Sequence, residues 1–255
     1  MTKNILILSL VFTFFLSGCV PKQETLKDAL QTNSANIMKK DYKNIQKVLI
    51  SFKEKIDKRN PNAYSKNLSK RIYRLIHELN NNFLLKYKNT TLENYKDYLH
   101  IAFSKDEINK RNDYLILGLY YLVHYSYEID KGHRIIALEY DKEKLHNLYK
   151  NLQIIKWKIK VDKDVHGNYL FLTWQNNWQI ELEKRLKNKE EISLNTFLDL
   201  NHIKNKQETF LDHSNFSFEV QLTQMIDSVK NSLEALGEEP TDLSVMALKS
   251  VFMFL

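Results

Sequence analysis

The sequence predicts an all-α protein built as a single irregular bundle of several helices. Apolar residues recur at steps of three and four over most of the chain from residue 36 onward, which is the period of an amphipathic helix. Residues 114–123 are apolar or aromatic on all sides, so a helix there must be surrounded by others. Residues typical of helix ends stand between these segments, which supports the same prediction.

Two helices are expected in the first third of this domain. The first begins near Ile37, with lysines on its outer face and a buried stripe formed by Tyr42, Ile45, Leu49, Phe52 and Ile56. Asn60 and Pro61 are typical of a helix start, because asparagine caps free N–H groups and proline at the first position loses no hydrogen bond. A second helix is therefore predicted from there toward Tyr87.

The centre of the core is expected after Ser104. Thr90 and Glu93 have the spacing of a capping box, as do Ser104 and Glu107, so each pair predicts a helix start. Gly118 lies in the fully apolar segment, where glycine costs about 1 kcal/mol of helix stability relative to alanine. It therefore predicts that a neighbouring element approaches the backbone closely at this point.

Residues 141–187 allow two interpretations. Asp141 predicts an N-cap, and the apolar spacing favours two helices, the second beginning near Phe171, joined by a turn near Gly167. The alternative is a small β-hairpin near residues 155–174, where side chains alternate strictly over two short stretches. We favour the pair of helices because the helical period continues on both sides of the alternating part.

The C-terminal region predicts one strong amphipathic helix. Its expected buried side chains are Phe218, Leu222, Met225, Ile226, Val229 and Leu233. Gly237 is typical of the residue that ends such a helix, and Pro240 prevents its continuation. Thr241 is then expected to cap a last helix.

The N-terminus carries a separate signal. An uncharged run from Ile5 to Leu16 follows Lys3, with the length of the apolar region of a secretory signal peptide and too few residues to span a bilayer. The sequence Leu16-Ser17-Gly18-Cys19 closes this run and resembles the lipobox of bacterial lipoproteins. The resemblance implies that a peptidase removes the leader and that Cys19, the single cysteine, becomes a lipidated N-terminus.

This resemblance sets the expected domain organisation and location. Residues 1–18 are a signal peptide, residues 19–35 are the lipidated N-terminus and tether, and residues 36–255 form the helical domain. The lipid anchor makes the membrane a partner and places the chain in the cell envelope. Val20 after the cysteine favours the outer membrane, with the domain facing the periplasm.

Charge does not make nucleic acid an expected partner. The formal net charge is +7, but lysine, asparagine, isoleucine and tyrosine are abundant as an AT-rich genome would produce them. Arginine, which supplies bidentate phosphate contacts, is scarce. The lysine excess therefore indicates codon bias as readily as a binding function.

One row of polar residues is a candidate ligand pocket. Tyr120, His124 and Glu128 are spaced four apart, so they would share one face of a helix and could form a proton relay or the wall of a pocket. The competing interpretation is a core histidine satisfied by Glu128 where the helix emerges, and we favour it. No nucleophile is predicted because acylation uses Cys19, and no cofactor is predicted because no glycine-rich phosphate loop is present. No metal site is predicted either, because acidic residues that stand three before a histidine, such as Glu143 before His146, lie opposite the buried stripe.

Trp174 and Trp178 form the second candidate. With the amides between them they have the residue types that stack on and hydrogen-bond to sugars. Their spacing of four is also typical of core packing on one helix face, which we favour.

Two hypotheses on function follow. The first is a non-catalytic assembly, scaffold or transport-accessory protein of the envelope that binds a protein partner through a helical face. The second is an envelope ligand-binding domain, for a glycan or small molecule, or a hydrolytic domain, built on the His124/Glu128 or Trp174/Trp178 region. Burial discriminates between them, since a wet concave pocket at these residues would favour the second.

Overall fold

The structure is a computed structural model of the full chain. It describes residues 33–78, 83–131, 140–173, 177–205, 216–244 and 247. Within these ranges it contains nine α-helices, one short 3-10 helix and a two-stranded sheet, which confirms the predicted all-α bundle. The predicted signal segment, Cys19 and the tether up to residue 32 lie outside the described residues.

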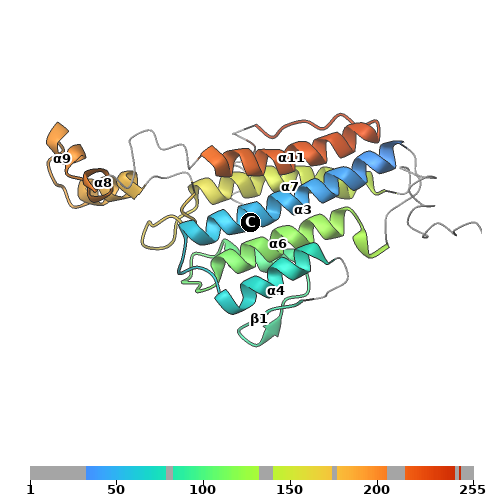
Figure 1. Ribbon diagram of the computed structural model, residues 1–255, viewed down its shortest axis with the longest axis horizontal. Helices are drawn as coiled ribbons and strands as arrows, with labels where there is room; N and C mark the ends of the chain where they lie inside the picture. Colours follow the sequence, from blue (N-terminus) through green and yellow to red (C-terminus); the bar gives the residue numbers. More distant parts are fainter. Residues whose placement is uncertain are drawn as a thin grey trace, which may run out of the picture.

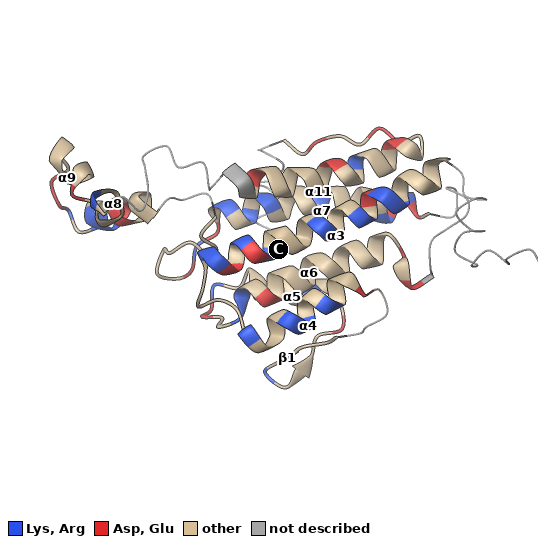
Figure 2. Ribbon diagram, viewed as in Figure 1, with Lys and Arg blue, Asp and Glu red and all other residues tan. Residues whose placement is uncertain are grey.

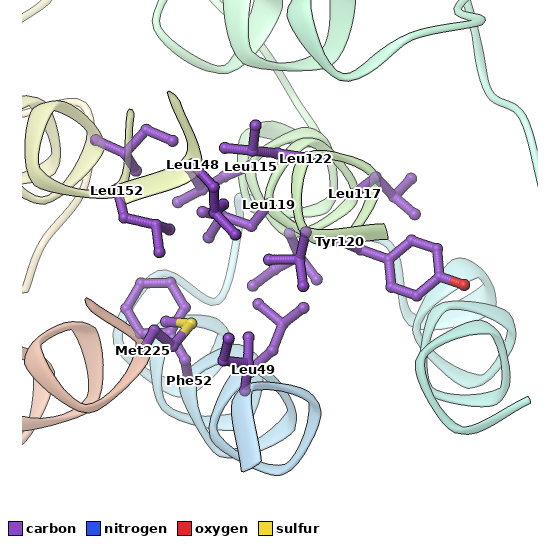
Figure 3. Close-up of a cluster of buried hydrophobic side chains, with 14 of the residues drawn as sticks. Leu49, Phe52, Leu115, Leu117, Leu119, Tyr120, Leu122, Leu148, Leu152 and Met225 are labelled. Carbon is purple, nitrogen blue, oxygen red and sulfur yellow. The ribbon is translucent and has the colours of Figure 1, made fainter. Parts of the chain in front are cut away.

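Four long helices form the bundle. They are α3 (Asn33–Arg59), α6 (Arg111–Ser126), α7 (Lys142–Val161) and α11 (Phe216–Ala235). Helix α11 packs along α3 and α7, and α6 packs against α3 and α7 from the other side (Figure 1). Leucines of α6 and α7 meet Leu49, Phe52 and Met225 in the space between the four helices (Figure 3).

Helix α6 is the most enclosed element. Fourteen of its 16 residues are buried, and the charged residues of the molecule lie mainly on the surrounding helices (Figure 2). Helix α5 (Tyr95–Ala102) crosses it at Gly118, where a Cβ atom would lie 2.7 Å from Cδ2 of Leu99. The predicted close approach at Gly118 is confirmed.

Two sequence predictions before α5 are wrong. The helix expected from Asn60 begins at Lys66 as α4 (Lys66–His77), with Ser65 at the N-cap, because Asn60 instead bonds the carbonyl groups of Ile56 and Leu172. It does not continue toward Tyr87. A short antiparallel hairpin follows, formed by β1 (Lys86–Tyr87) and β2 (Thr90–Thr91).

Neither predicted capping box starts a helix. Thr90 is part of β2, and Asn94 caps α5 by accepting from the backbone N–H groups of Lys96 and Asp97. The hydroxyl of Ser104 accepts from the N–H of Asp106, but α6 begins only at Arg111. The spacing of a capping box therefore also occurs in a strand, at Thr90, and in a turn, at Ser104, before the helix itself begins.

The region after Asp141 largely follows the favoured interpretation of two helices joined by a turn. Asp141 caps α7, and this helix continues through Val161, so the first alternating stretch is helical. In place of the alternative β-hairpin, the structure has one antiparallel bridge, between Lys163 and Tyr169. The bridge closes a turn in which Gly167 has φ +76°. Residues 171–173 are not helical, and the next helix is α8 (Asn177–Lys187).

Three short helices form an arm beyond one end of the bundle. Helix α8 is followed by α9 (Leu194–Leu198) and α10 (Asn201–Lys204), and the arm lies at the opposite end from the start of α3 (Figure 1). Glu181 on α8 accepts from the backbone N–H of Asn201 at 2.9 Å and pairs with Arg185. An ion pair between Lys163 and Glu183 ties α8 to the turn after α7.

Helix α11 ends as predicted. All six of its expected stripe residues are buried, and Gly237 takes φ +76° while its N–H bonds the carbonyl of Glu234. Thr241 does not cap a helix, since residues 241–244 have no regular structure. Among the described helices, none is both long enough and apolar enough to cross a bilayer.

Candidate functional site

Two of the three residues predicted to share one face of α6 do so. Tyr120 and His124 lie one turn apart with ring centroids 5.5 Å from each other. Helix α6 ends at Ser126, and Glu128 has a left-handed backbone with φ +50°, so it is not on the next turn of the same face. The carboxylate of Glu128 instead binds Lys144 of α7 at 2.7 Å.

All three residues of this row are buried. The exposed fraction is 4% for Tyr120, 9% for His124 and 8% for Glu128. Nδ1 of His124 lies 3.7 Å from the carboxylate of Asp130 in the 3-10 helix η1 (Ile129–Lys131). Burial, together with that carboxylate, raises the pKa of Tyr120 to about 12, so its phenol stays protonated. The row is packed into the protein, and it lines none of the cavities described below.

The tryptophan pair is only half described. Trp174 lies outside the described residues. Trp178 is half-buried in the first turn of α8. The favoured interpretation of the two rings as core packing and the alternative of a sugar-binding site therefore both stay predictions.

A buried ionic cluster was missed by sequence analysis. Lys53 on α3 is 0% exposed, and its Nζ donates to Asp57 at 2.6 Å and to Asp113 of α6 at 3.4 Å. The ammonium also lies over the rings of Tyr64 and Tyr73, at 5.4 and 5.5 Å from their centroids. Such an arrangement compensates a charge that would otherwise be costly to bury.

The cluster joins α3 to the start of α6. Asn112 donates to Asp57 at 3.0 Å, and Asp113 accepts from the backbone N–H of Ser65 at 2.7 Å. Burial of Asp113 raises the pKa of that carboxyl, against the lowering effect of Lys53. Since Asp57, Asn112 and Asp113 each bind a partner on another element of the fold, we interpret the cluster as structural.

One sequence signal could have found this cluster. Lys53 stands four residues after Leu49 and three before Ile56, so it occupies the buried stripe rather than the lysine-rich outer face. The expectation that lysines lie opposite the stripe is wrong at this position. Asp57 follows four residues later, at the spacing of a helix ion pair.

A second polar network links α3, α11 and Tyr127, the residue that follows α6. The phenol of Tyr127 and the hydroxyl of Ser232 lie 2.8 Å apart, and Ser232 donates to Asp41 at 3.0 Å. Burial raises the pKa of Asp41 to about 6, although hydrogen bonds from Ser232 and Asn231 act in the opposite direction. Folding therefore favours the protonated form of this carboxyl.

The raised pKa of Asp41 predicts a pH dependence of stability. The folded state holds the proton between pH 4 and 6 while the unfolded state releases it, so this group's contribution is present at low pH and is lost as pH rises through about 6. After allowance for the partial exposure of Asp41, we expect this loss to lower the free energy of unfolding by about 1–2 kcal/mol. Asparagine does not ionise, so the stability of the Asp41→Asn protein relative to the unsubstituted protein should rise by this amount between pH 4 and pH 7. Urea denaturation at a series of pH values measures this difference.

The matched control for removing this charge is Glu54→Gln, because Glu54 is exposed on the same helix. An unchanged difference in stability between the Asp41→Asn protein and the unsubstituted protein over the whole pH range would contradict the prediction.

The largest of the described cavities is a groove between α5 and α7. It has a volume of about 750 Å³ and is bordered by side chains of both helices. Its apolar lining includes Leu99, Phe103 and Ile154, and its basic lining includes Lys96 and Lys105. Sequence analysis missed this groove because its two walls are separated by about 50 residues of chain.

A second cavity lies where the arm meets the bundle. It measures about 490 Å³ and has Asn60, Tyr169 and Lys187 among its lining residues. Asn60 is fully engaged with the backbone of Ile56 and Leu172, and Lys163 covers the ring of Tyr169 at 4.2 Å. These side chains stabilise the junction between arm and bundle.

Comparison with known proteins gives no relative. No family model, no curated protein and no solved structure matches the chain. The class of protein rests on the fold and the sequence signals alone.

Proposed function

We propose that this chain is a lipid-anchored, non-catalytic protein of the bacterial cell envelope, which serves as an assembly, scaffold or transport-accessory factor. The observation that carries the proposal is the sequence Leu16-Ser17-Gly18-Cys19 after a short uncharged run. Acyl chains on Cys19 would hold the helical bundle at the outer membrane, facing the periplasm.

The packing of the polar row supports a non-catalytic role. A reacting group must meet its substrate, yet Tyr120 and His124 are buried against each other and Glu128 is bound to Lys144. This favours the interpretation of His124 as a core histidine, with Asp130 as its nearby carboxylate.

The arm supports binding of a protein partner. Leu186, Leu194 and Leu198 expose 55%, 78% and 55% of their surface. Exposed apolar residues that gather on one part of a molecule are typical of interaction sites. The arm extends from the end of the bundle farthest from the start of α3, so it would point away from an anchored membrane (Figure 1).

Mass spectrometry of the mature protein tests the anchor. We expect a polypeptide that begins at Cys19 and carries acyl chains, and we expect it in the membrane fraction. Cys19→Ser is the matched variant and should keep its leader and lack acyl chains. An unmodified thiol at Cys19 in the mature chain would contradict the proposal.

Substitution of His124 tests the non-catalytic role. Removing this buried ring leaves a cavity beside Tyr120, so His124→Ala should lower the free energy of unfolding by about 1–3 kcal/mol. The exposed His77, at the end of α4, gives the control His77→Ala, which should lower it by less than about 1 kcal/mol. Unchanged melting of the His124 variant would instead favour a pocket at this row.

A further inference from the structure

The groove is bordered by α5 and α7, both of which pack on α6. Its volume of about 750 Å³ lies within the range of small-molecule sites, roughly 300–1,000 Å³. Leu99, Phe103 and Ile154 are only half-buried, so an apolar occupant would remove further apolar surface from water.

Side-chain contacts show the relative chain direction of α5 and α7, which form the two walls of the groove. At one end, Nζ of Lys158 on α7 lies 4.9 Å from the ring centroid of Phe103, just after α5. At the other end, Tyr125 of α6 contacts both Tyr95 at the start of α5 and Lys144 at the start of α7. The two helices therefore run the same way along the groove.

This direction divides the groove into two ends of different chemistry. The donor end is formed by residues that can donate hydrogen bonds from both helices, namely Lys96, His100, Asn147 and Asn151. The apolar end is formed by Leu99, Phe103, Ile154 and Ile155. Lys96 on α5 and both asparagines on α7 precede the apolar residues of their helices, while Ser104, Lys105 and Lys158 follow them at the rim of the apolar end.

The charge of the lining is of one sign. Lys96, Lys105 and Lys158 line the groove, and no aspartate or glutamate does. Lys158 is paired with Asp162 at 2.9 Å, at the apolar end. Burial raises the pKa of Asp162 while Lys158 and Lys105 lower it, so this carboxylate offsets part of the charge of the two lysines at the apolar end. Within the described part of the chain, Lys96 makes no ion pair, so its charge at the donor end is available to a ligand.

We propose that this groove binds a medium-chain fatty acid, with its carboxylate at the donor end and its acyl chain along the apolar end. Lysine, histidine and amide side chains donate to a carboxylate, while hydrocarbon is matched by leucine, isoleucine and phenylalanine. The lining from Asn147 to Lys158 of α7 spans about 16 Å, which suits an extended chain of roughly a dozen carbons.

Photo-crosslinking of the full chain in membranes tests this proposal. The probe is dodecanoate with a diazirine in its acyl chain, followed by purification of the protein and digestion with trypsin. Cleavage after lysine releases the peptides 97–105 and 151–156, which carry the apolar end from α5 and α7. We expect the label in these two peptides, and label confined to other segments would overturn the proposal.

Competition separates the carboxylate from the hydrocarbon. Unlabelled dodecanoate should suppress labelling at a concentration at least about tenfold lower than dodecyltrimethylammonium, which has the same chain and the opposite charge. Equal suppression by the two compounds would contradict recognition of an anion.

Two variants locate the two ends on the protein. Lys96→Glu, measured on the intact chain, should reduce labelling about tenfold, whereas Lys150→Glu, exposed on α7 outside the groove, should leave it unchanged. Ile154→Trp should fill the apolar end and also abolish labelling. Both variants should melt within a few degrees of the unsubstituted protein, and full labelling of either one would overturn the assignment.

Discussion

Replacing Lys53 with methionine is expected to lower the free energy of unfolding by about 3–5 kcal/mol. Methionine keeps the length of the side chain but removes the ammonium that binds Asp57 and Asp113. Both carboxylates then stay buried without their shared cation, beside the rings of Tyr64 and Tyr73. Urea denaturation followed by circular dichroism measures the loss.

The same helix supplies the control. Lys55 is exposed on α3, so Lys55→Met should change the stability by less than about 0.5 kcal/mol. Adding Asp113→Asn to the Lys53→Met protein should restore part of the loss, because the amide is neutral and its oxygen can still accept from Ser65. Equal stability of the Lys53→Met and Lys55→Met proteins would show that the cluster is not structural.

Enlarging Gly118 is expected to have the second large effect. A Cβ atom there would lie 2.8 Å from Cγ of Leu99 and 3.3 Å from its backbone nitrogen, so α5 itself must move. Overpacking costs about 1–3 kcal/mol or more, and the better helix propensity of alanine offsets about 1 kcal/mol. We expect a loss of about 1–2 kcal/mol for Gly118→Ala and about 3 kcal/mol for Gly118→Val in thermal denaturation.

Substitution of Leu99 tests whether crowding against its side chain causes the loss of stability. In the Leu99→Ala protein the crowding atoms are gone, so adding Gly118→Ala should cost at least about 1 kcal/mol less than it does alone. Additive effects, within about 0.5 kcal/mol, would mean that Gly118 is retained for a reason other than contact with α5.

Local patterns predicted the elements whose packing simply follows their own periodicity. The stripe of α11 is buried as expected and the helix ends before Gly237, because a left-handed residue is what the end of a helix requires. Gly118 indicated a helix crossing without showing which helix crosses. In each case the information lies within a few residues of the position that was predicted.

The failures share one cause. The spacing of Thr90 and Glu93 fits a helix cap, yet Thr90 pairs with Tyr87 in a hairpin. Glu128 was assigned to the face of His124, but its binding to Lys144 depends on where α6 ends. Spacing alone does not show which of several possible partners a residue takes, whether that partner is as near as Tyr87 is to Thr90 or as far as Lys144 is from Glu128.

The sequence by itself determined the helical class, the buried stripes of α3 and α11 and the resemblance of its N-terminus to a lipoprotein signal, because periodicity and short motifs are local properties. Only the tertiary structure decided that Lys53 is buried against Asp113, sixty residues further along the chain. It likewise decided that α5 and α7 border one groove. Contacts of this kind depend on how the helices pack, and no single segment of the sequence encodes that packing.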